Sequence, residues 1–113
     1  EPLDLWEAVR QGATGRRRTF DRLEKFLSGT YDPADFALAL LHKDVSLAVG
    51  LGKDVGVPMR LANLTLEELT EAVNRGWEKR DSRVSGLLQI ERAGIPPLDV
   101  DPAKIQAILD SDN

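Results

Sequence analysis

Residues 36–58 read FALALLHKDVSLAVGLGKDVGVP and decide the fold of the whole chain. Apolar residues recur in this stretch at the spacing of a helix, and no proline interrupts them before Pro58. Asp32 followed by Pro33 is a typical helix start, with the carboxylate as N-cap and proline in the first turn. Gly56 supplies the residue that usually ends a helix. We therefore expect a central helix over about residues 33–55, roughly 35 Å long at about 1.5 Å per residue.

Two apolar stripes run along this expected helix. The first contains Phe36, Leu40, Lys43, Leu47 and Leu51, with Asp44 beside it, and the second contains Ala37, Leu41, Val45, Ala48 and Val55. A helix that is apolar on two sides is expected to be buried on two sides. Lys43 and Asp44 interrupt the first stripe, so they are expected to be paired, to reach water, or to line a cavity. Spacing alone favours a solvated pair over a binding site.

The rest of the chain also predicts helices. We expect helices over residues 2–11 and 17–28, the second of them ended by Gly29. A further helix is expected with Asp81 as its N-cap and Gly94 at its end, and a last one starts at Asp101-Pro102. Another helix follows Pro58 and begins either there or at the capping-box pattern of residues 65–68. No stretch alternates apolar and polar residues as a strand does. The predicted fold class is all-α, a compact bundle of five or six helices around the central one.

Composition narrows the classes of function. The chain has 113 residues, a net charge of −4 and no cysteine, which argues against nucleic acid binding, disulfides and thiolate metal sites. Its one histidine, His42, cannot form a metal site by itself, and we expect no metal. No apolar run is long enough for a membrane span, so a soluble, cytoplasmic protein is expected. Gly50 and Gly52 lie within the helical pattern, where they indicate close packing and not a phosphate loop.

The run from Phe36 to Ala48, with Lys43-Asp44 in its middle and Gly-Val-Pro at residues 56–58, resembles the C-terminal helical domain of the β-hydroxyacid dehydrogenases. That family includes 3-hydroxyisobutyrate dehydrogenase and tartronate semialdehyde reductase, with 6-phosphogluconate dehydrogenase as a larger relative. Residues 12–15, Gly76 and residues 81–82 extend the resemblance, which covers roughly residues 3–95. It implies a helical domain over residues 1–95 and an extension over residues 96–113 that packs on the domain or clasps a neighbouring subunit.

The resemblance also implies roles for three residues. Lys43 matches the family's lysine that reaches the nicotinamide end of NAD or NADP, which makes it a cofactor-binding residue. Asp44 and Phe36 match residues of the substrate pocket. The family's catalytic lysine and its dinucleotide-binding domain lie upstream of these 113 residues, so no catalytic residue is assigned and the isolated chain is expected to be inactive.

Two classes of function follow. The first is the substrate, cofactor and oligomerisation domain of an NAD(P)-dependent oxidoreductase that acts on a small β-hydroxyacid similar to 3-hydroxyisobutyrate, in a homo-oligomer. The second is a freestanding helical interaction or dimerisation module in which the Lys43-Asp44 pair is incidental. A helix-turn-helix DNA-binding protein is a distant third, because the chain is acidic.

Overall fold

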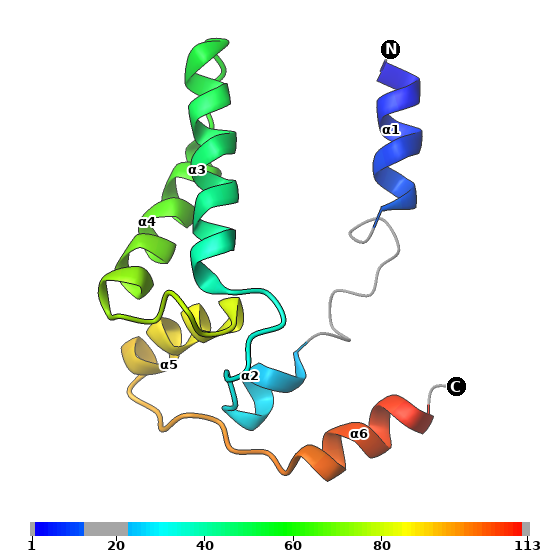
Figure 1. Cartoon of the computed structure of the whole chain (residues 1–113), viewed down its shortest axis with the longest axis vertical. Coiled ribbons are helices and arrows are strands. Elements are labelled where there is room, and N and C mark those ends of the chain that lie inside the picture. Colours follow the sequence, from blue (N-terminus) through cyan, green and yellow to red (C-terminus); the bar gives the residue numbers. More distant parts are fainter. Residues whose placement is uncertain (1, 13–22, 112–113) are drawn as a thin grey trace.

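The computed structural model describes residues 2–12 and 23–111, and within these ranges the regular elements are helices joined by loops (Figure 1). The α-helices are α1 (Pro2–Gln11), α2 (Glu24–Ser28), α3 (Leu38–Asp54), α4 (Arg60–Asn74), α5 (Leu87–Ala93) and α6 (Pro102–Ser111), and a 3₁₀ helix, η2 (Ser82–Gly86), precedes α5. The described residues contain one isolated β-bridge, between Ala37 and Asp81, and no named strand. The all-α prediction is confirmed.

The central helix starts later than the sequence predicts. Asp32 and Pro33 are joined by a cis peptide bond and lie outside α3, which begins at Leu38 after the extended residue Ala37. The N–H groups of Leu38 and Ala39 donate to the carbonyl oxygens of Arg80 and Glu78, at 2.8 and 2.9 Å. A neighbouring loop therefore satisfies the first turn of α3 and replaces the expected side-chain cap. The predicted end of the helix is confirmed, because Gly56 adopts a positive φ of 71°.

The core lies where α3, α4, η2 and α5 meet. Its buried residues come from all of these elements and from the loop before α3, and they are Tyr31, Leu38, Leu69, Ala72, Val84 and Leu88. Of the two proposed starts for the helix after Pro58, the structure selects the early one, since α4 begins at Arg60. Thr65 is inside the helix and its hydroxyl donates to the carbonyl oxygen of Leu61.

Glycines in the left-handed region end two further helices as predicted. Gly29 follows α2 and Gly94 follows α5, and both have a φ of 68°. The predicted second helix is shorter in the described part of the chain, which shows α2 from Glu24, while residues 17–22 lie outside the described residues. Asp81 does act as an N-cap, accepting a hydrogen bond from the backbone N–H of Arg83, but the helix that it caps first is the 3₁₀ helix η2.

The C-terminal extension packs on α2. Val100 donates its backbone N–H to the carbonyl oxygen of Leu27 at 2.9 Å. A Cβ at Gly29 would lie 2.6 Å from the carbonyl oxygen of Leu98, so the two backbones meet where only glycine fits. α6 starts at the predicted place, where the Asp101 carboxylate accepts from the N–H of Ala103, and Ile105 of α6 is buried. The structure thus shows the extension packed on the domain, which is one of its two expected roles.

The helices are arranged more loosely than the predicted compact bundle. The radius of gyration is 16.4 Å, compared with about 13 Å expected for a compact domain of this length. Figure 1 shows why: α4 packs along α3, while α1 stands apart from the other helices and α6 extends outward from its contact with α2.

Candidate functional site

The side of α3 that faces away from α4 is an exposed apolar surface, which we call the outer face. It consists of Phe36, Leu40, Lys43, Asp44, Leu47 and Leu51, all of which are exposed. The sequence predicted that both apolar stripes of this helix are buried, and that prediction is wrong for the first stripe, which forms the outer face. It is only partly right for the second stripe, in which Leu41 and Val45 are half-buried but Ala48 and Val55 are exposed. The described chain has α4 packed against one side of α3, where Leu38 and Val49 are buried, and no described element covers the other side.

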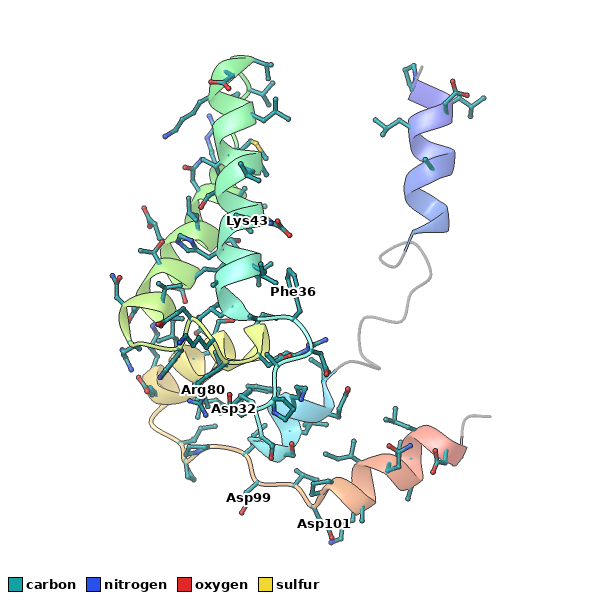
Figure 2. All side chains as sticks on the ribbon, viewed as in Figure 1. Asp32, Phe36, Lys43, Arg80, Asp99 and Asp101 are labelled. Atoms are coloured by element: carbon teal, nitrogen blue, oxygen red, sulfur yellow. The ribbon has the colours of Figure 1, made fainter. Side chains whose placement is uncertain are left out.

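Lys43 and Asp44 lie in the middle of the outer face. The Lys43 Nζ is 3.1 Å from an Asp44 carboxylate oxygen, and the two side chains are 59% and 54% exposed. Figure 2 shows Lys43 and Phe36 projecting from α3 on the side away from α4. An ion pair between two exposed side chains contributes at most about 1 kcal/mol to stability. The fold therefore does not depend on this pair, which leaves both groups free to contact a ligand.

Phe36 precedes α3 and is fixed through its backbone. Its N–H donates to a carboxylate oxygen of Asp81 at 3.3 Å, and its carbonyl oxygen accepts from the N–H of Ser82 at 2.8 Å. Phe36 is 37% exposed, so part of the residue is covered by protein and part is open. All three predicted site residues thus lie on one face of the molecule.

Asp81 is the most deeply buried charged group of the described chain, with no exposed surface. Burial pushes the pKa of Asp81 upward, but hydrogen bonds from Arg83, Asp35 and Phe36 outweigh burial and hold the pKa below its usual value. The carboxylate is therefore charged and paired at neutral pH.

His42 has a structural partner. Its Nε2 lies 2.9 Å from the Thr70 hydroxyl, so the half-buried ring joins α3 to α4. Among the residues that the structure describes, no group of histidine and acidic side chains is placed to hold a metal ion. None of the described helices combines the length and the apolar content that a membrane span requires.

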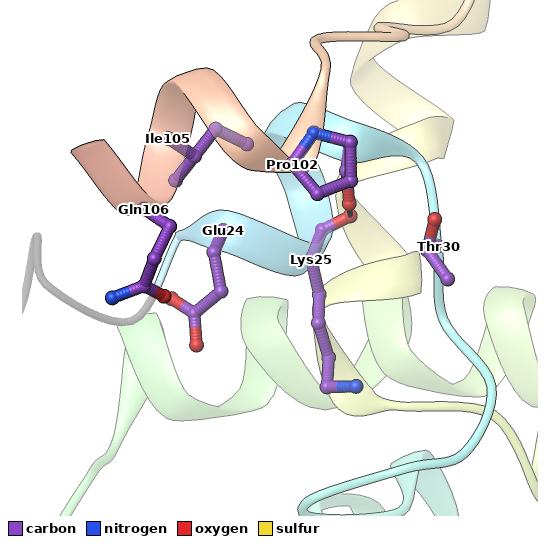
Figure 3. Close-up of a pocket in the computed structure, with 7 residues that line it drawn as sticks. Glu24, Lys25, Thr30, Pro102, Ile105 and Gln106 are labelled. Carbon is purple, nitrogen blue, oxygen red and sulfur yellow. Dashed lines mark hydrogen bonds between the residues drawn. The ribbon is translucent and has the colours of Figure 1, made fainter. Parts of the chain in front are cut away.

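A cavity of about 240 Å³ lies between α2 and α6 (Figure 3). Glu24 and Lys25 of α2 and Ile105 of α6 contribute to its walls. Neither Lys43, Asp44 nor Phe36 lines this cavity. Because all three residues are exposed, the candidate site is an open surface of the described chain.

The fold and this surface together define an all-helical domain with one face left open around a lysine–aspartate pair. A family model described as "NAD-binding of NADP-dependent 3-hydroxyisobutyrate dehydrogenase" matches residues 1–89, which is most of the chain. The chain belongs to this family of C-terminal, NAD(P)-binding domains of β-hydroxyacid dehydrogenases. No curated protein and no solved structure matches the chain significantly.

Sequence reasoning missed how the segment before α3 is held. Asp81 was identified as a helix cap, but its contacts with Asp35 and Phe36 span 46 and 45 residues, and no local pattern reveals them. The sequence held one signal for this role: Asp81 lies two residues before Arg83, the arginine that forms an ion pair with it.

Proposed function

We propose that this chain forms one wall of the cofactor and substrate cleft of an NAD(P)-dependent dehydrogenase that acts on a small β-hydroxyacid such as 3-hydroxyisobutyrate. The outer face of α3 carries this proposal. It places a lysine and an aspartate among four large apolar side chains on a surface that no described element covers. A dinucleotide-binding domain from outside these 113 residues would lie against it.

The residues of the outer face fit a nicotinamide dinucleotide. An ammonium group such as that of Lys43 donates hydrogen bonds to the carboxamide, ribose or phosphate oxygens of the cofactor. Leu40 and Leu47 flank Lys43 on the same face and offer apolar surface to a flat ring. We assign Lys43 to cofactor binding on this basis. The family model, which matches an NAD-binding domain over α3, supports the assignment.

Asp44 and Phe36 are the proposed substrate-side residues. Asp44 holds the Lys43 ammonium at 3.1 Å and so limits the positions that the ammonium can take. Phe36 presents an open aromatic surface that would exclude water from one side of a small hydroxyacid. The bound NAD(P) supplies the hydride acceptor or donor. Proton transfer belongs to the family's catalytic lysine, which has no counterpart in the motif matched here.

A second apolar surface supports a role in assembly. Val55, Val57 and Leu61 are exposed together around the turn that joins α3 to α4, with Leu61 the most exposed of them at 81%. Exposed apolar surface of this kind marks contact sites with other proteins. We propose that this turn contacts another subunit of a homo-oligomer, and that the enzyme is cytoplasmic.

Replacing Lys43 in the intact enzyme, with its dinucleotide-binding domain, tests the proposal. We expect Lys43→Ala to raise the KM for NAD(P) about tenfold or more, because a charged hydrogen-bond donor to the cofactor is lost. The free energy of unfolding should change by less than about 0.5 kcal/mol, since the side chain is exposed. Steady-state kinetics and urea denaturation measure the two effects.

Lys53→Ala is the matched control, because Lys53 is an exposed lysine of the same helix that lies off the outer face. Its kinetics should match those of the wild type. Wild-type kinetics for Lys43→Ala as well would refute the cofactor assignment and favour the freestanding interaction module.

A further inference from the structure

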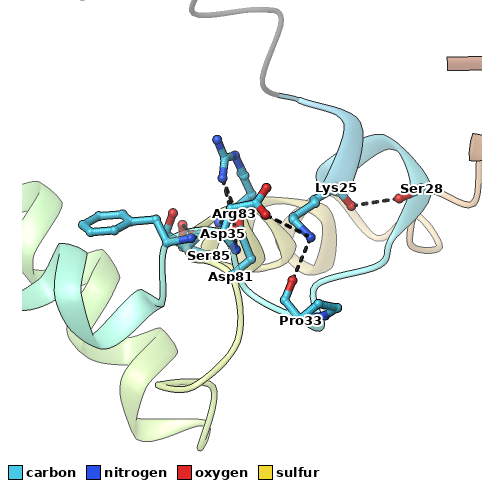
Figure 4. A network of polar contacts seen from close by, with 9 residues as sticks. Lys25, Ser28, Pro33, Asp35, Asp81, Arg83 and Ser85 are labelled. Carbon is cyan, nitrogen blue, oxygen red and sulfur yellow. Dashed lines mark hydrogen bonds and ion pairs between the residues drawn. The ribbon is translucent and has the colours of Figure 1, made fainter. Parts of the chain in front are cut away.

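The segment between α2 and α3 carries Phe36 and has no regular secondary structure of its own. It runs from Thr30 to Ala37, and Tyr31 is its one buried side chain. A segment of this kind keeps a fixed path only where other elements hold it. Figure 4 shows contacts that hold this segment through residues on two different elements, Lys25 of α2 and Asp81 before η2.

Asp81 holds the segment through backbone N–H groups. One of its carboxylate oxygens accepts from the N–H of Asp35 at 3.0 Å and from the N–H of Phe36 at 3.3 Å. The other accepts from the N–H of Arg83, and the Arg83 guanidinium contacts both oxygens at 3.1 Å. A carboxylate that is fully buried and bonded on both oxygens has one orientation, so it fixes the positions of the two donors.

Lys25 holds the same segment through a carbonyl group. Its Nζ donates to the carbonyl oxygen of Pro33 at 2.7 Å and lies 3.9 Å from the Asp35 carboxylate. The Lys25 side chain is only 16% exposed, although lysine usually extends into water. Its aliphatic stem is therefore packed against protein, and its ammonium group binds this segment.

We propose that Asp81 and Lys25 form a clamp that positions the Phe36 ring for the hydroxyacid substrate. This inference rests on the proposed function, which places Phe36 at the substrate. Neither residue reaches the outer face, so both are positioning residues and not catalytic ones. The clamp binds the backbone at the carbonyl of Pro33 and at the N–H groups of Asp35 and Phe36. Small displacements of a positioning group cost large factors in turnover efficiency, about 100-fold for 1 Å.

Two variants of the intact enzyme test the clamp. Asp81→Asn loses the charge and one acceptor oxygen, and Lys25→Met keeps the apolar stem while removing the donor. We expect the KM for the hydroxyacid to rise about tenfold in Asp81→Asn and about threefold in Lys25→Met. The KM for NAD(P) should stay within about twofold of wild type in both, because Lys43 lies further along α3 and is untouched. Lys79→Met, at an exposed lysine next to the clamp, is the control and should change neither constant.

A merely structural role would lower the amount of active enzyme without separating the two KM values. A double-mutant cycle sharpens the distinction: in a Phe36→Ala background, Lys25→Met should add no further increase in the KM for the hydroxyacid. Amide hydrogen exchange of the 113-residue chain supplies a direct readout, with faster exchange expected at Asp35 and Phe36 in Asp81→Asn. If Asp81→Asn does not fold, Lys25→Met and the cycle decide the matter.

The outcomes separate the two proposals. If Phe36→Ala raises the KM for the hydroxyacid but Lys25→Met and a folded Asp81→Asn leave it unchanged, the clamp is refuted and the proposed function stands. If Phe36→Ala leaves that KM unchanged, the substrate role of Phe36 is refuted, and the clamp loses its function together with it.

Discussion

The two faces of α3 carry similar apolar residues, but one face is buried and the other is exposed. Leu38 and Val49 on the inner face are buried against α4 and its neighbours, whereas Leu40, Leu47 and Leu51 on the outer face are exposed. Leu38 is completely buried and Leu47 is 65% exposed, although both are leucines of the same helix. Hydrophobicity alone therefore does not decide burial; a covering element does.

The difference also separates stability from function along one helix. The residues of the inner face make their contacts within the chain, since they pack on α4 and His42 contacts the hydroxyl of Thr70. The outer face holds the Lys43–Asp44 pair, whose removal costs the fold little. Substitutions on the inner face should change stability, and substitutions on the outer face should change binding.

The largest expected effect is at Leu38. Leu38→Ala should lower the free energy of unfolding by about 3 kcal/mol, because it removes buried methyl groups and leaves a cavity. Leu47→Ala deletes the same atoms from the outer face and should change stability by less than about 0.5 kcal/mol. Urea denaturation of the two variants measures both. Equal losses would show that the outer face is covered in solution, by a second copy of the chain for example.

Two glycines of α3 give a smaller effect of opposite sign. A Cβ at Gly52 would lie 2.5 Å from the Sδ of Met59 and 3.0 Å from the Val57 carbonyl oxygen, so Gly52→Ala should destabilise by about 1–2 kcal/mol. A Cβ at Gly50 would meet no atom of a neighbouring element within 4 Å. Gly50→Ala should therefore stabilise the helix by about 0.5–1 kcal/mol. Thermal denaturation should move the two midpoints in opposite directions, and a loss of stability in both variants would contradict this interpretation of the contacts.

The smallest expected effect is at Asp44. Asp44→Asn removes the charge that pairs with Lys43, and it should change the free energy of unfolding by less than about 0.5 kcal/mol, because both partners are more than half exposed. In the intact enzyme the same variant should raise the KM for the hydroxyacid. A loss of more than about 1.5 kcal/mol in urea denaturation would make the pair structural and would undermine its assignment to a site.

Local patterns predicted the helices well, because the groups that end them act locally. Gly29, Gly56 and Gly94 end helices in the left-handed conformation, and α6 begins after Asp101 as expected. The start of α3 was predicted wrongly at Pro33, because its real cap comes from carbonyl groups of residues 78 and 80. Such long-range partners are invisible to patterns that compare neighbouring residues.

The site was predictable in part. Lys43 and Asp44 are neighbours on α3, as helical spacing predicts, whereas Phe36 precedes the helix and is held on the same face by backbone hydrogen bonds. Their roles came from the family resemblance, and they remain proposals. Whether that face was buried could not be read from the sequence, because apolar spacing does not say which side of the helix another element covers. The clamp at Asp81 and Lys25 was missed for the same reason as the cap of α3.

The contact between Gly29 and Leu98 bears on where this chain can be shortened. The family model stops at residue 89, yet the backbone continues past it to lie on α2, where Leu98, Val100 and Ile105 are in place. A protein that ended at residue 89 would lack these contacts. The side of α2 that they cover would then be exposed to water, on the helix that carries Lys25. The folded unit of this chain therefore extends past the family boundary to α6.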